Sequence, residues 1–192
     1  MQAQKTGLRN DLAFHYCTDA SDFLDRFNLL YEHYSKTKRF KCFVDLLMGF
    51  ECILKSHIFL SHQSDDMKEV YKAVRRCGHS LSRLGSLANY SSATDYQAIQ
   101  ENLGEYSVFL RYSLDAYENF LPSCAGFGEG KYNYSSTLTN HPWMMSQRDL
   151  LQKLIDLTSD EFGGFVDLDF DKIVDEAKQM REFAKDVGVV NS

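Results

Sequence analysis

Apolar residues recur every three or four positions over the first two thirds of the chain, a spacing typical of amphipathic helices. The first such stripe predicts a helix from about residue 20 to 36, with polar residues before it that can cap its start. The second, from about 39 to 61, has a wide apolar face that consists of Phe40, Phe43, Val44, Leu47, Phe50, Leu54 and Ile58. Because a face this wide is expected of a helix packed on two sides, we expect the second helix to be the central one.

Three more helices are predicted in the middle of the chain. The first of them covers about residues 65 to 90, where Ser64 to Asp66 supply a cap and favourable negative charge at the N-terminus. Two shorter helices follow, near 94 to 103 and near 106 to 121, and Pro122 ends the second of them.

The last third of the chain contains a long loop and two closing helices. A glycine- and serine-rich segment over about residues 122 to 146 predicts the loop, in which Lys131 to Tyr134 can pair as a short hairpin. The closing helices are expected near 146 to 158 and 169 to 187, again from apolar spacing. The whole pattern predicts an all-α fold, an antiparallel helical bundle with a long loop and two C-terminal helices.

Composition supports a single folded helical domain over residues 1–192, because 44% hydrophobic and 25% charged residues with only 2 prolines exclude general disorder. The net charge of -6 does not favour nucleic-acid binding by the whole surface, so an anion site has to be local. The 5 cysteines lack the spacing of a zinc site, and the first residues lack a long apolar run. We therefore expect reduced thiols, a cytoplasmic location, no metal site and no membrane attachment.

The strongest candidate for a binding site is a basic island in the third predicted helix. A continuous helix would align four of its side chains on one cationic ridge at positions i, i+4, i+7 and i+11, namely Lys72, Arg76, His79 and Arg83. Arg75 stands beside that ridge, which suits a phosphate, although an ordinary solvated charged face is the alternative. Gly78 costs a helix interior about 1 kcal/mol against alanine, which favours close packing of a neighbouring backbone there, or else a bend.

A buried ion pair is predicted in the second helix. Glu51 is in register with the apolar Leu47 and Leu54, which places a carboxylate on or beside the apolar face. Lys55 lies one turn further and can pair with it, as can a cation of the third helix. We expect a structural ion pair near Gly78, where the two helices cross.

Three short motifs lie within about residues 20 to 120: Glu51-Cys-Ile-Leu-Lys55, Gly78-His79-Ser-Leu81 and Leu110-Arg111-Tyr112-Ser113. Together they resemble the motifs of the HEPN superfamily. The resemblance implies an all-helical bundle that commonly dimerises, and a role as a nucleotide-binding module, as a partner of a nucleotidyltransferase, or as a toxin or defence ribonuclease. Ser80 stands where the family usually has aspartate, and Ser113 where it often has proline.

Catalytic HEPN members have an arginine and a histidine with four to six residues between them, and this pair cleaves RNA across a dimer without a metal. Arg75 and Arg76 are separated from His79 by only three and two residues, so that spacing is not met. We therefore expect a non-catalytic dimer without a cofactor that binds nucleotide or RNA phosphate through Lys72, Arg75, Arg76, His79, Arg83, Arg111 and Tyr112.

Two alternative functions stay open. The first is a metal-independent endoribonuclease toxin in which His79 acts with Arg75 or Arg76. The second is a pure interaction module whose basic face docks an acidic protein partner.

Overall fold

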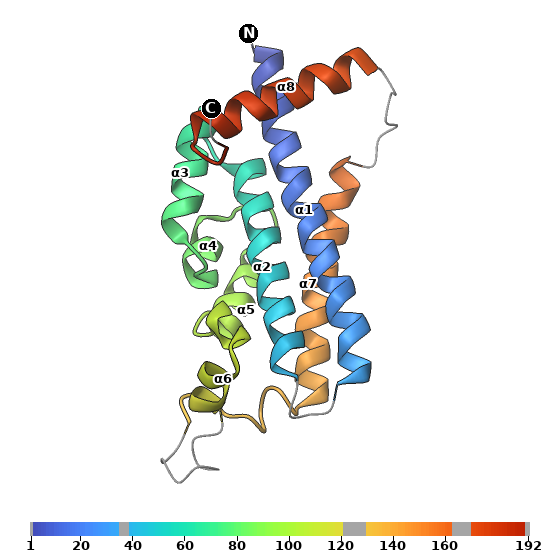
Figure 1. Ribbon diagram of the computed structural model, residues 1–192, viewed down its shortest axis with the longest axis vertical. Helices are drawn as coiled ribbons and strands as arrows, with labels where there is room; N and C mark the ends of the chain where they lie inside the picture. The colour runs from blue at the N-terminus through green and yellow to red at the C-terminus, as the bar shows by residue number, and fades with distance from the viewer. Residues whose placement is uncertain (1, 35–38, 121–129, 163–169, 191–192) are drawn as a thin grey trace.

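The computed structural model describes residues 2–34, 39–120, 130–162 and 170–190. All regular secondary structure in these ranges is helical, which confirms the all-α class. Three long helices lie side by side along the long axis of the molecule (Figure 1): α1 (Gln2–His33), α2 (Phe40–Ser61) and α7 (His141–Phe162). The α1 helix runs antiparallel to the other two, so these three helices form the expected antiparallel bundle.

Shorter helices follow one another along the side of α2 that faces away from α7 (Figure 1). In chain order they are α3 (Met67–Cys77), α4 (Leu81–Leu87), α5 (Ala93–Leu103), the 3₁₀ helix η2 (Val108–Arg111) and α6 (Ser113–Phe120). The last helix, α8 (Phe170–Asp186), crosses the end of the bundle at which α1 begins.

The α2 helix is central, as predicted, because its side chains are buried around almost the whole circumference. Phe43, Phe50 and Ile53 are fully buried in the core. Gly49 lets α7 approach closely, since a Cβ atom at this position would lie 2.6 Å from Leu151 Cδ2. The predicted bounds of α2 and α5 are confirmed to within one residue.

The first helix is longer than predicted, because α1 begins at Gln2 rather than near residue 20. Its apolar stripe continues backwards through the buried Leu12, Ala13 and Cys17. The Tyr16 ring stacks on Phe59 of α2 with centroids 5.7 Å apart. The polar residues between these positions form the solvated face of the helix and conceal the stripe in the sequence.

The prediction of one continuous third helix is wrong. Gly78 ends α3 with φ +56°, and Ser80 caps α4 by accepting a hydrogen bond from the Arg83 backbone N–H at 3.3 Å. A Cβ atom on Gly78 would meet nothing within 4 Å, so the expectation of close packing at this glycine is also wrong. The bend, which was the alternative, is confirmed, and the glycine is needed for its positive φ.

Three predictions for the second half of the chain are also corrected. The helix expected near 106 to 121 divides into η2 and α6, because Tyr112 between them is extended, with ψ 133°. Residues 130–140 form turns instead of a hairpin, and 121–129 lie outside the described residues. The α7 helix begins earlier than predicted, since Asn140 caps it by accepting from the Trp143 N–H at 3.1 Å.

Candidate functional site

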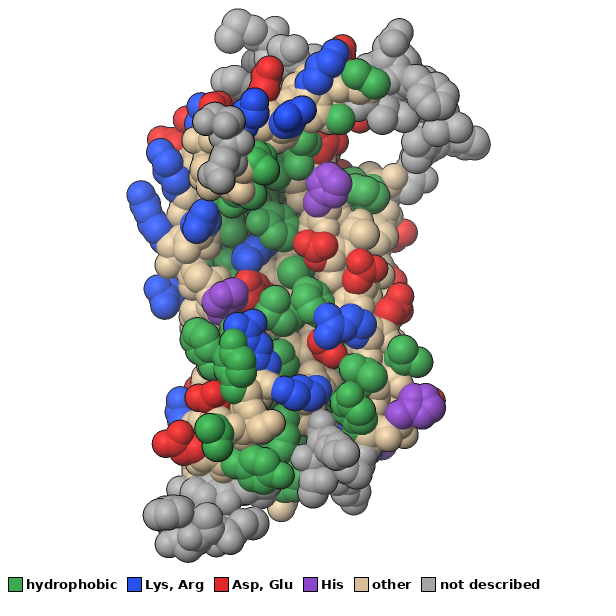
Figure 2. Space-filling model, in the orientation of Figure 1, with side chains coloured by type: hydrophobic (Ala, Val, Ile, Leu, Met, Phe, Trp, Pro, Cys, Tyr) green, Lys and Arg blue, Asp and Glu red, His purple; other side chains and the backbone are tan. Residues whose placement is uncertain are grey.

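Four exposed cations surround the turn between α3 and α4, and we call them the cationic cluster: Lys72, Arg75, Arg76 and Arg83. Lysine and arginine side chains gather along the edge of the molecule that α3 forms (Figure 2). Within the described part of the chain, no member of the cluster lies within ion-pair distance of a carboxylate. The cluster is therefore a local positive surface on a protein of net charge -6.

The cluster is not the single ridge that the sequence suggested, because the turn at Gly78 puts Arg83 on a different helix. The two parts stay together, since Arg83 Nη1 donates to the Arg76 carbonyl at 3.3 Å. Arg75 lies over the Tyr71 ring at 5.9 Å from its centroid. Arg75 and Arg76 also occupy the last turn of α3, where positive charge stabilises a helix by interaction with its dipole.

A buried carboxylate connects this turn to the central helix. The Glu51 side chain is only 2% exposed, and both its oxygens have partners. Lys55 Nζ donates to Oε1 at 2.5 Å, and His79 Nδ1 lies 2.8 Å from Oε2. The predicted contact between Glu51 and Lys55 is thus present near Gly78. The sequence predicted a cation of the third helix as a possible partner of Glu51 but did not identify His79 as that partner.

This contact determines which nitrogen of His79 carries a proton. An ionised carboxylate only accepts hydrogen bonds, so Nδ1 donates to Glu51. The His79 side chain is 55% exposed, and its Nε2 has no partner among the described residues. Nε2 can therefore take a proton from a bound molecule, or donate a hydrogen bond to an anion once it is protonated.

Two side chains on the inner side of this site, Tyr16 and Cys52, have raised pKa values. Lys55 Nζ lies 5.5 Å from the centre of the Tyr16 ring, and burial raises the pKa of the Tyr16 phenol to about 12. Burial also raises the pKa of the neighbouring Cys52 thiol to about 12. A thiol with such a pKa stays protonated at neutral pH, so Cys52 is not a nucleophile.

Arg111, the last residue of η2, and Tyr112, which follows it, lie apart from the cationic cluster, and η2 packs against α2 and α6. Arg111 Nη2 donates to the Tyr112 hydroxyl at 2.9 Å, and its guanidinium lies 4.8 Å from the centre of that ring. Lys41 Nζ donates to the Arg111 carbonyl. The predicted ligand-binding residues therefore form two groups, and only the group at the turn includes His79.

A second histidine, His57, is fully buried and has a structural role, because it forms hydrogen bonds to two other helices. Its Nδ1 lies 2.9 Å from the Tyr96 hydroxyl, and its Nε2 lies 2.8 Å from the Thr158 hydroxyl. Because Thr158 donates its own proton to the Leu154 carbonyl, it accepts from Nε2–H, and Tyr96 donates to Nδ1. Burial lowers the pKa of His57 to about 4, so the ring is neutral at pH 7.

The described ranges contain neither a metal-binding group nor a membrane-spanning helix. These residues contain no group of three or more histidine, cysteine, aspartate or glutamate side chains that could hold a metal ion. None of the described helices combines the length and the apolar character that a membrane span requires.

Comparisons of the chain with family models, with curated proteins and with solved structures found no match. The likeness to the HEPN superfamily therefore rests on the three sequence motifs alone. Two of these motifs contribute Glu51, Lys55 and His79, which meet in one hydrogen-bonded group.

Proposed function

We propose that this chain is a HEPN-like module that binds the phosphate of a nucleotide or of RNA on the cationic cluster and His79. The observation that supports this proposal is the group of four exposed cations without a carboxylate partner in the described residues. Like charges that stand together repel one another, and a phosphate relieves that repulsion. Arginine is the side chain best suited to this ligand, because its planar fork binds two phosphate oxygens at once.

His79 contributes a hydrogen-bonding group of fixed orientation to this proposed site. Its Nδ1 is committed to the buried Glu51, which leaves Nε2 available to the ligand. A hydrogen bond from a protonated Nε2 to a phosphate oxygen would complement the guanidinium groups of Arg76 and Arg83. Glu51 holds the ring in place, so little freedom of the histidine would be lost on binding.

A salt titration with matched variants tests this function. We would measure the binding of a fluorescent 5′-phosphorylated oligoribonucleotide and of a labelled nucleoside triphosphate at about 50 and about 200 mM salt. We expect binding that weakens as salt rises, and a loss of about tenfold or more in the double variant Arg76→Ala, Arg83→Ala. The control is Lys178→Ala, Arg181→Ala on α8, which removes the same charge from another exposed site. Absence of binding at the lower salt, or an equal loss in the control, would contradict the proposal.

The hydrogen bond between His79 and Glu51 favours a second candidate function, a metal-independent endoribonuclease. In this reaction His79 Nε2 takes the proton of a ribose 2′-hydroxyl, whose oxygen attacks the adjacent phosphorus. The bond from phosphorus to the 5′-oxygen breaks, that oxygen takes up a proton, and a cyclic phosphate remains. Arg75 or Arg76 would stabilise the charge that develops on the phosphorane oxygens.

This candidate is tested by incubating the protein with mixed RNA in the presence of a chelator. The ribonuclease candidate predicts three results: the wild type cleaves RNA, His79→Ala does not, and an oligonucleotide that carries 2′-deoxyribose is not cleaved. Equal cleavage by wild type and variant, or none by either, rejects catalysis and leaves the binding function as it stands.

We also propose that the module forms a homodimer. Large apolar side chains are exposed around η2 and α6, and Leu114 is 85% exposed. The others in this patch are Phe109, Tyr112 and Tyr117. Burying such a patch against a second copy removes apolar surface from water, which is the usual driving force of association.

A further inference from the structure

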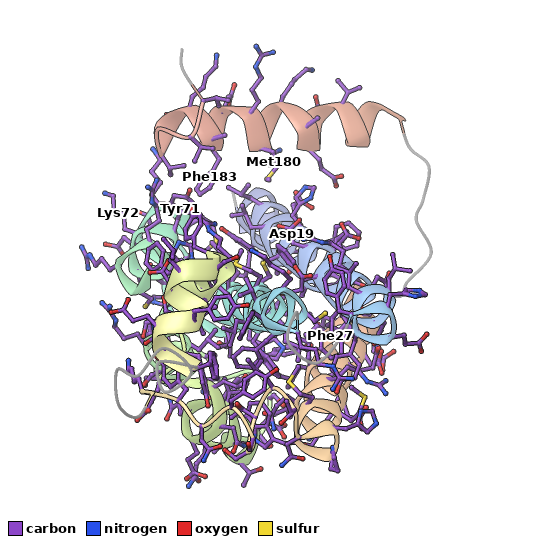
Figure 3. The ribbon with its side chains drawn as sticks, turned by 60° about the horizontal axis from the view of Figure 1, so that its bottom comes forward. Asp19, Phe27, Tyr71, Lys72, Met180 and Phe183 are labelled. Carbon is purple, nitrogen blue, oxygen red and sulfur yellow. The ribbon has the colours of Figure 1, made fainter. Side chains whose placement is uncertain are left out.

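A cavity of about 260 Å³ lies between α1, α3 and α8, and no member of the cationic cluster is among the described residues that line it. Met180 and Phe183 reach into it from α8, while Tyr71 lies on α3 and Asp19 on α1 (Figure 3). Figure 2 shows hydrophobic side chains along the hollow between α3 and α1. The Phe183 and Tyr71 rings meet edge to face with centroids 5.6 Å apart, and Lys68 pairs with Asp186 at 2.8 Å, so α8 is held in place over α3.

The cavity contains polar groups that no described residue satisfies. Among the described residues that line it, Asp19 is the only aspartate, glutamate, lysine or arginine, and His15 lies one turn before it. The Asp19 carboxylate makes no hydrogen bond or ion pair with any residue that the structure describes. The hydroxyls of Tyr16 and Tyr71, which also line the cavity, likewise have no hydrogen-bond partner in those ranges. Asp19 is itself exposed, so water solvates its carboxylate when no ligand is bound. An apolar cavity with a few polar groups at fixed positions is the usual form of a small-molecule site.

Two groups act on Asp19 with positive charge: His15, one turn before it in the lining, and Lys55, whose ammonium is bonded to Glu51 at 2.5 Å. Burial and the charge of Asp22 outweigh both, because the pKa of the Asp19 carboxyl is raised above its usual value. Arg75 contacts the Tyr71 ring but does not line the cavity. Asp22 adds a second negative charge close to Asp19. The surroundings therefore favour a cation and disfavour an anion.

We propose that this cavity is a binding site for a small organic cation, an ammonium group on an apolar, ring-bearing body. The ammonium would donate hydrogen bonds to the Asp19 carboxylate and to the Tyr16 hydroxyl. The apolar body would contact Met180 and Phe183. The volume of about 260 Å³ is slightly below the usual range of about 300 to 1,000 Å³ for such sites, so the ligand has to be small.

Methionine methyl groups provide the readout for a test with three probes of the same skeleton: 2-phenylethylamine, 2-phenylethanol and 3-phenylpropanoate. Met180 lines the cavity. In protein labelled with ¹³C at the methionine methyls, the Met180 signal is identified by its absence in Met180→Leu. We expect the amine to shift the Met180 signal to saturation, the alcohol to bind about tenfold more weakly, and the carboxylate to cause no shift. Met48 and Met144, which do not line the cavity, should stay unchanged.

Four variants locate the interaction. Asp19→Asn should reduce the affinity for the amine to that for the alcohol. Asp22→Asn, which removes a likewise exposed carboxylate outside the lining, should change the amine affinity by less than about threefold. Ala184→Leu should fill the cavity and abolish binding of both probes, and a thermal melt checks that it folds. The double variant Arg76→Ala, Arg83→Ala should leave the amine affinity unchanged, so this site and the phosphate site fail independently.

Three results would overturn the proposal. They are equal or tighter binding of the carboxylate probe, an undiminished amine affinity in Asp19→Asn, and absence of a specific Met180 shift with the amine at millimolar concentration.

Discussion

His79 in the turn after α3 lies 2.8 Å from the carboxylate of Glu51, which is buried in the middle of α2. The contact joins an exposed, titratable side chain to the most buried carboxylate of the candidate site. It depends on the positive φ of Gly78, because a continuous helix would carry His79 past this position. The same contact therefore stabilises the turn and orients His79, and each of these two effects can be measured on its own.

Removing the Glu51 carboxylate should destabilise the fold. In Glu51→Ala, the ammonium of Lys55, which is mostly buried, loses its partner, and His79 loses its acceptor. We expect the free energy of unfolding to fall by about 3 kcal/mol, as for other broken buried pairs. Urea denaturation measures this change, with Glu32→Ala on the exposed face of α1 as the control. Equal stability of wild type and Glu51→Ala would show that the pair contributes nothing to the fold.

Gly78→Ala should destabilise the turn because a φ of +56° with ψ -128° strains any residue with a Cβ atom. We expect a loss of about 1 to 3 kcal/mol, measured by urea denaturation, although no atom obstructs the added methyl. Gly7→Ala is the matched control, since this glycine lies in α1 with equally open surroundings. There alanine should raise stability, by up to about 1 kcal/mol. The same sign in both variants would argue against backbone strain at Gly78.

His57 should make stability depend on pH. The folded state holds its pKa at about 4, below the ordinary value of 6.5, because burial disfavours the charged ring. Its neutral form stabilises the fold fully above pH 6.5, and this stabilisation is lost as the pH falls from 6.5 towards 4. We expect it to contribute a loss of about 2 kcal/mol between pH 7 and pH 5.

Urea denaturation of wild type and His57→Gln at both pH values isolates this contribution, since the other titrating groups are common to the two proteins. The variant should be less stable at pH 7 and should lose less on acidification. Parallel pH dependence in the two proteins would show that His57 does not titrate differently in the folded and unfolded states.

The proposed dimer should depend on the patch around α6. Leu114→Asp places a charge in that patch and should shift the protein from dimer to monomer at micromolar concentration. Light scattering after size exclusion measures the mass. Leu29→Asp is the control, because Leu29 is 63% exposed on α1 and lies outside the patch. A monomeric wild type, or an equal effect of the two substitutions, would contradict this interface.

Local pattern alone determined the helices whose apolar positions repeat without interruption. The bounds of α2 followed from the spacing of core residues, and Asp66 caps α3 as the charge pattern suggested. The bounds of α5 followed from capping residues at its start, although Ser92 and not Thr94 or Asp95 caps it. The contact between Glu51 and Lys55 was predictable for the same reason, since residues four apart on one helix face each other.

Only the tertiary structure decided how distant helices meet. A glycine inside a helical pattern costs about 1 kcal/mol, too little for the sequence to distinguish a bend at Gly78 from a continuous helix. The contact between His79 and Glu51 joins residues 28 positions apart, and it exists only because the bend turns α4 back against α2. The cavity around Asp19 requires α1, α3 and α8 together. Their relative placement is set by the packing of the whole core, which periodicity along one segment does not encode.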